Sequence, residues 1–231
     1  MVDHPLQVWH LLTRLGEAQI LLPAAALALL ALLRDAPGRR LALWWVGLGS
    51  AAVLATTATK LAFIGWGVGS AALDFTGISG HAMFAAAIYP LLFGALAPSV
   101  TRWLAPARRV SPTPVWISVG LGATLALAIG VSRVVVHAHS ASEVVAGLAL
   151  GAAVCAVALW RSHPPQRVLT PWVPALALAW LALTPGLASA SRTHPMVTRL
   201  ALALSGHDSP YTRAELHTGL RAREAREARG G

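Results

Sequence analysis

The chain has 231 residues, of which 56% are hydrophobic and only 12% are charged, and its formal net charge is +9. Because soluble domains carry roughly 25% charged residues, this composition excludes an ordinary soluble globular protein. The positive charge lies in arginine clusters beside apolar segments, without interleaved aromatic side chains, so it indicates orientation in a membrane and argues against nucleic-acid binding. The single cysteine, Cys155, excludes an intrachain disulfide and a cysteine metal site.

The apolar residues fall into six segments, each close in length to the roughly 20 residues that a helix needs to cross a bilayer. In chain order they are Ala18–Leu33, Leu41–Thr59, Ala82–Ala97, Val115–Val131, Val144–Trp160 and Val168–Ala188. The sequence therefore predicts an all-α, polytopic membrane protein built as a six-helix transmembrane bundle. We expect an interfacial segment in residues 1–17, the transmembrane domain in residues 18–189 and a polar, arginine-rich tail in residues 190–231. Gly147 and Gly151, four residues apart, predict close helix packing.

The connections between these segments differ in charge. Three of them, residues 34–40, 98–114 and 161–167, hold eight arginines, whereas the connections 60–81 and 132–143 hold only Lys60 and Arg133. By the positive-inside rule the arginine-rich connections are cytoplasmic, so the two sparse connections share the opposite face. Six spans would place both termini on that outer face as well.

The connection 132–143 carries a compact group of polar residues. His139 and Glu143 are four residues apart, so on one helical turn Glu143 can accept a hydrogen bond from one ring nitrogen of His139. The other ring nitrogen then keeps a lone pair for attack on phosphorus. Arg133 adds a planar fork of donors for a phosphoryl group. Because ionisable groups at the ends of membrane helices are costly, a functional role is the default hypothesis.

A second polar group lies in the connection 60–81. Lys60 is the only lysine of the chain, beside 17 arginines, and its point charge suits a phosphate oxygen. Ser79 and Gly80 precede the third apolar segment, where a helix N-terminus presents free N–H groups to an anion. His81 follows directly and is placed to give a proton to a departing alkoxide. Positioning and charge neutralisation are what phosphoryl transfer mainly needs, and these residues supply both.

These residues resemble the type 2 phosphatidic acid phosphatase superfamily, which also includes the vanadium haloperoxidases. That family carries Lys-x6-Arg-Pro, then Pro-Ser-Gly-His, then Ser-Arg-x5-His-x3-Asp. Here the third block reads Ser132-Arg133-x5-His139-x3-Glu143, with Glu in place of Asp, and the second reads Ile78-Ser79-Gly80-His81, with Ile in place of Pro. The first block keeps Lys60, but Gly67-Val68 stands where Arg-Pro is expected. The blocks lie within residues 60–143, and the resemblance extends over about residues 41–160.

The resemblance implies a metal-independent hydrolase without a cofactor, in which His139 is the nucleophile that forms a phosphohistidine. Glu143 would orient His139, and His81 would be the general acid. The residues implied in phosphate binding are Lys60, Ser79, Gly80 and Arg133. The substrate would be a lipid phosphate or diphosphate held in the bilayer, of the phosphatidic acid, phosphatidylglycerol phosphate, polyprenyl diphosphate or lipid A type. We expect a bacterial inner membrane, with the active site facing the periplasm.

The sequence leaves several interpretations of the site and of its function open. The missing arginine at Gly67 would weaken the phosphate site, change the substrate, or be replaced by a tail arginine such as Arg192. One alternative is a rhomboid-like intramembrane serine protease that uses Ser79 and His139, since Gly-x-Ser-Gly also occurs there. Another is a non-catalytic relative of the phosphatases. His137 would support the site or lie on the surface, and Asp74 would brace Lys60 or His81, or cap its loop.

Overall fold

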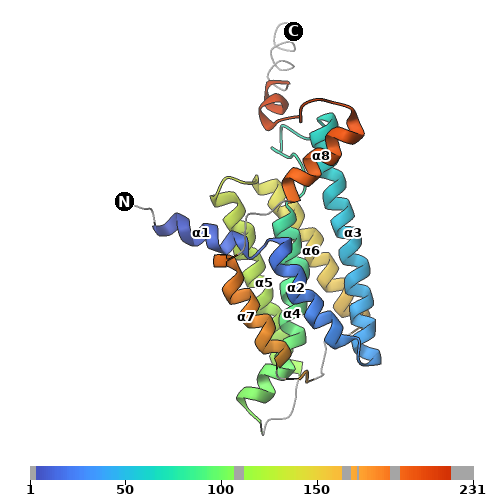
Figure 1. Cartoon of the computed structure of the whole chain (residues 1–231), viewed down its shortest axis with the longest axis vertical. Helices are drawn as coiled ribbons and strands as arrows, with labels where there is room; N and C mark the ends of the chain where they lie inside the picture. Colours follow the sequence, from blue (N-terminus) through green and yellow to red (C-terminus); the bar gives the residue numbers. More distant parts are fainter. Residues whose placement is uncertain (1–3, 107–111, 163–167, 171, 188–192, 220–231) are drawn as a thin grey trace.

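The computed structural model describes residues 4–106, 112–162, 168–170, 172–187 and 193–219, and these residues form a helical bundle (Figure 1). In chain order the helices are α1 (His4–Arg14), α2 (Ala18–Leu32), α3 (Ala36–Trp66), α4 (Gly80–Leu104), α5 (Pro112–Val135), α6 (Ala141–Ser162), α7 (Trp172–Leu187) and α8 (Thr193–Ser205). In this part of the chain β pairing is limited to an isolated bridge between Ser70 and Phe75. The prediction of an all-α protein is confirmed for the described residues.

Four of these helices, α3 to α6, are long and apolar enough to cross a membrane. Helices α1 and α2 meet at a bend of 45° and pass the same criterion together as one broken span. Helix α7 has 16 residues and so rises about 24 Å, less than the roughly 30 Å of a bilayer's hydrocarbon core. Large apolar side chains on the outer surface, such as Leu43 and Leu54, are mostly exposed, as lipid-facing positions are. The apolar helices fit a membrane protein, while the count of six spans stays a prediction.

Helix α4 is the centre of the bundle, because 83% of its apolar window is buried against 28% to 44% for the other long helices. Two glycines of α6 allow the closest approach to it. A Cβ on Gly147 would lie 2.5 Å from the carbonyl oxygen of Ser79, and one on Gly151 would overlap the carbonyl oxygen of Met83. The predicted close packing at these glycines is confirmed. It holds the start of α4 beside the start of α6, where the Ser79 N–H donates to the Glu143 carbonyl at 3.1 Å.

The two polar connections lie at the same end of the bundle, the upper end in Figure 1. Residues 67–79 join α3 to α4 there, and residues 136–140 join α5 to α6. The connection between α2 and α3 lies at the opposite end (Figure 1). The polar residues of both connections are therefore neighbours in space, as expected. Which membrane face this end meets stays a prediction.

Both terminal segments also reach this polar end. Helix α1 projects from the side of the bundle in Figure 1, and the bend that follows it at Gly16 lies against His81 and Ile129. Helix α8 packs on α3, and the chain after it turns back onto the end of α3. There the N–H of Tyr211 donates to the Ile64 carbonyl at 3.0 Å. The expected positions of residues 1–17 at the interface and of the tail on the outer face stay predictions.

Candidate active site

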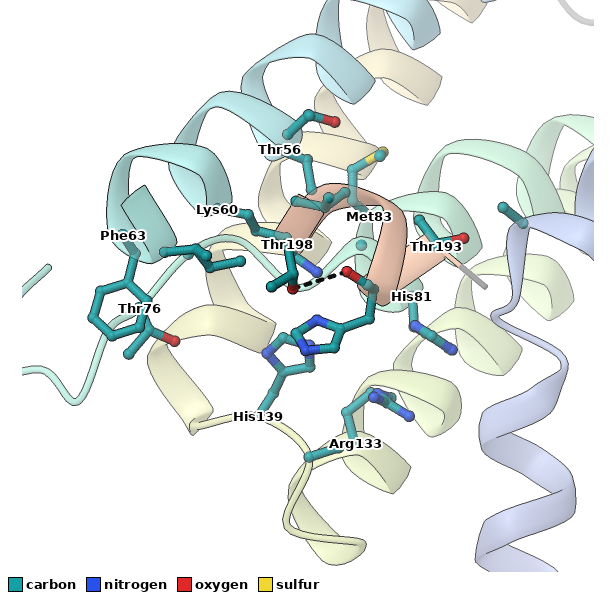
Figure 2. A pocket seen from close by; sticks show the side chains of 18 of the residues that line it. Thr56, Lys60, Phe63, Thr76, His81, Met83, Arg133, His139, Thr193 and Thr198 are labelled. Carbon is teal, nitrogen blue, oxygen red and sulfur yellow. Dashed lines mark hydrogen bonds between the residues drawn. The ribbon is translucent and has the colours of Figure 1, made fainter. Parts of the chain in front are cut away.

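A cavity of about 650 Å³ opens at the polar end of the bundle, between α3, α4, α5 and α8. It is lined by five of the residues that the sequence singles out: Lys60, Gly80, His81, Arg133 and His139. Figure 2 shows four of them with their side chains, each arriving from a different element. The tertiary structure therefore brings together residues that are 79 positions apart in the sequence, from Lys60 to His139.

Lys60 and Arg133 lie within helices, whereas the sequence predicts them in the connections. Helix α3 continues past Thr59 to Trp66 and ends at Gly67, which adopts the left-handed conformation with φ 69°. Lys60 therefore stands on a rigid helix and not in a connection, and its rotamers are limited by the helix around it. Arg133 likewise lies in the last turn of α5. The connections are shorter than predicted because polar residues at these ends do not stop the helices.

His139 and Glu143 form the predicted pair. Nδ1 of His139 lies 2.6 Å from Oε2 of Glu143, and the N–H of Ser140 donates to the same oxygen at 3.2 Å. His139 lies in the turn before α6, and Glu143 lies in the first turn of that helix. With Nδ1 donating to the carboxylate, Nε2 is left as the unprotonated nitrogen of a neutral ring.

The electrostatics around His139 favour this neutral form. Burial lowers the pKa of the His139 imidazole, and the charges of Lys60 and Arg133 lower it further, against the raising effect of Glu143. The net direction is downward, so the ring keeps its lone pair at a pH where an ordinary histidine begins to protonate. This is the state that nucleophilic attack requires.

The other oxygen of Glu143 is held from the α3–α4 connection and from the C-terminal segment. Thr76 donates to Oε1 twice, from its N–H at 2.7 Å and from its hydroxyl at 2.5 Å. Arg213 donates to Oε1 at 2.8 Å through its guanidinium. The side chain of Glu143 has no exposed surface, so these donors replace the water that a carboxylate would otherwise bind.

The start of α4 lies beside the cations. A methyl group on Gly80 would lie 3.9 Å from Nζ of Lys60, which places the ammonium next to the first turn of α4. The first N–H groups of a helix have no partner within it, so Gly80 and His81 present donors at this point. Ser79 lies differently from the expectation, because it is fully buried behind the cavity and its N–H already bonds to Glu143. Its hydroxyl has no hydrogen-bond partner among the described residues.

Arg133 is oriented by a residue that the sequence did not indicate. One terminal nitrogen of its guanidinium donates to the hydroxyl of Thr13 at 2.7 Å, while the buried Nε has no partner among the described residues. Unpaired buried donors of this kind suit an anion in the cavity. Within the described residues, no group of three or more His, Cys, Asp or Glu side chains is arranged to hold a metal ion.

Sequence reasoning missed Thr13, Thr76 and Arg213. Arg192, named as a tail candidate, lies outside the described residues, and among the described residues of the tail Arg213 is the arginine that lines the cavity. A local signal marks its segment, since Thr212-x-x-Glu215 is a capping box in which the Thr212 N–H donates to Glu215 at 2.7 Å. That signal predicts an ordered turn of helix but not what the turn contacts.

The structure also shows where Asp74 and His137 lie. Asp74 does not brace Lys60 or His81. It pairs with Arg213 at 2.7 Å and with His217 at 2.7 Å. His137 is exposed and has a positive φ of 54°, and it is not among the residues that line the cavity.

Two of the comparisons with known proteins find a match. The model of the PAP2 superfamily matches residues 56–167. A protein of Klebsiella pneumoniae, described as an uncharacterized 22.5 kDa protein in the cps region, is 37% identical over 221 residues, which cover 90% of this chain and 97% of that protein. No solved structure matches. The range matched by the family model contains every site residue predicted from the sequence, whereas Thr13 and Arg213 lie outside it.

Proposed function

The chain belongs to the PAP2 superfamily, and on that premise we propose that it is a membrane-integrated, metal-independent phosphatase that hydrolyses a lipid phosphate or diphosphate through a phosphohistidine. The observation that carries the proposal is the contact of 2.6 Å between His139 Nδ1 and Glu143 Oε2, in a cavity that also holds Lys60 and Arg133. A carboxylate-held histidine facing two cations is an arrangement suited to attack on a phosphoryl group.

The proposed reaction has two steps. Nε2 of His139 attacks phosphorus, and the bond from phosphorus to the lipid oxygen breaks while His81 gives that oxygen a proton. Water then attacks the phosphohistidine, His81 takes a proton from the water, and the N–P bond breaks to release inorganic phosphate. Lys60, Arg133 and the N-terminus of α4 neutralise the charge on the phosphoryl oxygens in both steps. Glu143 holds the ring and stabilises its charged form as the N–P bond forms.

The cavity supports an amphiphilic substrate. Beyond its cationic end it is lined by apolar side chains of α3, α4 and α8, among them Val53, Phe84 and Val197. A lipid phosphate would place its phosphate at the cationic end of the cavity and its acyl or prenyl chain among these apolar side chains. We infer from the arginine distribution that this end faces the periplasm of a bacterial inner membrane.

Phosphate release in detergent tests the proposal directly. The purified protein should release phosphate from at least one of phosphatidic acid, phosphatidylglycerol phosphate, polyprenyl diphosphate and phosphorylated lipid A, with EDTA present and with inhibition by vanadate. His139→Ala and Arg133→Ala should abolish release, and a radiolabelled phosphate should be trapped on the wild-type enzyme but not on His139→Ala. Activity that survives both substitutions would rule out this mechanism.

A rhomboid-like serine protease would require a different arrangement of the site. A serine nucleophile needs a hydrogen bond to its histidine, but the buried Ser79 hydroxyl has no partner among the described residues and Ser79 does not line the cavity that His139 lines. Cleavage of a transmembrane peptide that depends on Ser79 alone would nevertheless establish the protease. A protein that releases no phosphate and cleaves no peptide would be the non-catalytic relative.

A further inference from the structure

The C-terminal segment, residues 206–219, is docked on the polar end of the bundle by several contacts. His207 bonds to the Gly65 carbonyl at 2.8 Å through Nδ1, and His217 bonds to Asp74 at 2.7 Å through Nε2. The ring of Tyr211 lies over Gly67, where a Cβ would come within 2.9 Å of it. These contacts fix the segment on both the end of α3 and the α3–α4 connection.

The contact at Gly67 links this docking to a departure from the family pattern. Gly67 occupies the position at which the chain lacks the expected arginine, and its φ of 69° is one that side chains other than glycine rarely adopt. Because the Tyr211 ring fills the space above it, a long side chain at position 67 and the docked segment exclude each other. The same segment that covers the bare glycine brings a different arginine to the site.

Arg213 uses its guanidinium as a bridge between two carboxyl groups. One terminal nitrogen donates to the Asp74 carbonyl at 2.6 Å and lies 2.7 Å from the Asp74 carboxylate. The other donates to Glu143 at 2.8 Å and to the Thr76 hydroxyl at 3.2 Å. The two terminal nitrogens carry four hydrogens, and four acceptors surround them. The terminal N–H groups of Arg213 are therefore directed at acceptors of the protein itself and not at a phosphate.

We propose that Arg213 is a positioning residue of the active site, which holds Oε1 of the buried Glu143 so that Oε2 stays on Nδ1 of His139. A carboxylate that is fixed at one oxygen has its second oxygen fixed as well. The C-terminal segment is thus part of the catalytic centre, although it lies outside the range that the family model matches. This inference deepens the proposed function and rests on it.

The experiment compares Arg213→Ala, Arg213→Lys and the control Arg199→Ala, an exposed arginine of α8. Steady-state phosphate release from the best lipid substrate in detergent should show kcat about 10- to 100-fold lower for Arg213→Ala with KM nearly unchanged, because the nucleophile is misplaced while the phosphate-binding groups remain. Arg213→Lys should lie between, since a point charge cannot bridge both carboxylates. Arg199→Ala should match the wild type, and added guanidinium should partly restore Arg213→Ala.

The pH profile separates positioning from a loss of folding. Without Arg213 the hydrogen bond from Glu143 that raises the pKa of His139 is loosened, so the acid limb of kcat for Arg213→Ala should move to lower pH. A merely structural loss lowers the amount of active enzyme and leaves the limb in place. An Arg213→Ala enzyme with kcat within twofold of the wild type and an unmoved limb would overturn the proposal.

Thermal unfolding distinguishes this failure from failure of the proposed function. If the wild-type protein releases no phosphate from any lipid, the enzyme proposal fails. The contact itself is then tested by a double-mutant cycle on the melting temperature. Arg213→Ala should lower it in the native background and much less in Glu143→Gln, where no buried charge is left unpaired. Equal shifts in both backgrounds would refute the Arg213–Glu143 coupling.

Discussion

Both terminal segments contact the cavity, but they contact opposite charges. The last turn of α1 presents the neutral hydroxyl of Thr13 to the guanidinium of Arg133 at 2.7 Å. The C-terminal segment presents the guanidinium of Arg213 to the carboxylate of Glu143 at 2.8 Å. Glu143 is fully buried, and a buried carboxylate that loses its counter-charge is far more costly than a half-buried arginine that loses a hydrogen bond to a neutral hydroxyl. The comparison therefore predicts unequal effects from the two contacts.

The largest expected effect is that of Glu143→Gln, which removes the charge that both His139 and Arg213 contact. We expect kcat to fall by about 100-fold or more, because the ring loses the carboxylate that orients it and stabilises its charged form. In this background Arg213→Ala should cost little more, whereas Thr13→Val should keep its full effect. The three single and two double variants are compared by kcat and KM for phosphate release, and fully additive losses of kcat for Glu143 and Arg213 would contradict the coupling.

Asp74→Asn tests the anchor of the C-terminal segment. Burial alone would raise the pKa of the Asp74 carboxyl, but hydrogen bonds from Arg213 and His217 outweigh this and lower it, so Asp74 is charged at neutral pH. Its neutral replacement should loosen Arg213 without removing it, and we expect kcat to fall by roughly 10-fold. Asp208→Asn, an exposed acid of the same segment, is the matched control for phosphate release. Equal rates for the two variants would contradict the anchoring role.

Thr13→Val tests the N-terminal contact, since valine keeps the shape of threonine and removes its hydroxyl. Arg133 keeps its charge but loses one acceptor that orients it. We therefore expect roughly a fivefold rise in KM, the size of one ordinary hydrogen bond, with kcat little changed. Thr124→Val on the exposed face of α5 is the control in the same kinetic assay. A larger effect on kcat than on KM would place Thr13 in the chemical step.

The smallest expected effect is a shift in the pH profile. The lowered pKa of His139 predicts that the acid limb of kcat/KM lies below the ordinary histidine value of about 6.5, because protonation removes the nucleophile. Glu143 raises that pKa, so Glu143→Gln should move the limb to still lower pH, in the same direction as Arg213→Ala and further. Rates of the three enzymes on one lipid, whose own ionisation is common to all, measure both shifts. Shifts in opposite directions would contradict the shared role of Glu143 and Arg213 in holding His139.

The sequence by itself determined the parts of this protein that depend on local spacing. Long apolar segments gave the helices, since a chain in lipid must satisfy its backbone hydrogen bonds internally. The interval of four residues gave the His139–Glu143 pair, and two small residues four apart gave the close contact of α6 with α4. The ends of helices were less well predicted, because Lys60 and Arg133 are tolerated within them where they face a cavity.

Only the tertiary structure decided which distant residues complete the site. Thr13 lies 120 positions from Arg133, and Arg213 lies 70 positions from Glu143, so no periodicity or motif connects either pair. The physical reason is that a buried carboxylate requires a counter-charge but does not specify where in the chain it comes from. Folding supplied it from the C-terminal segment, which is docked by contacts of His207, Tyr211 and His217 with residues far away in the sequence.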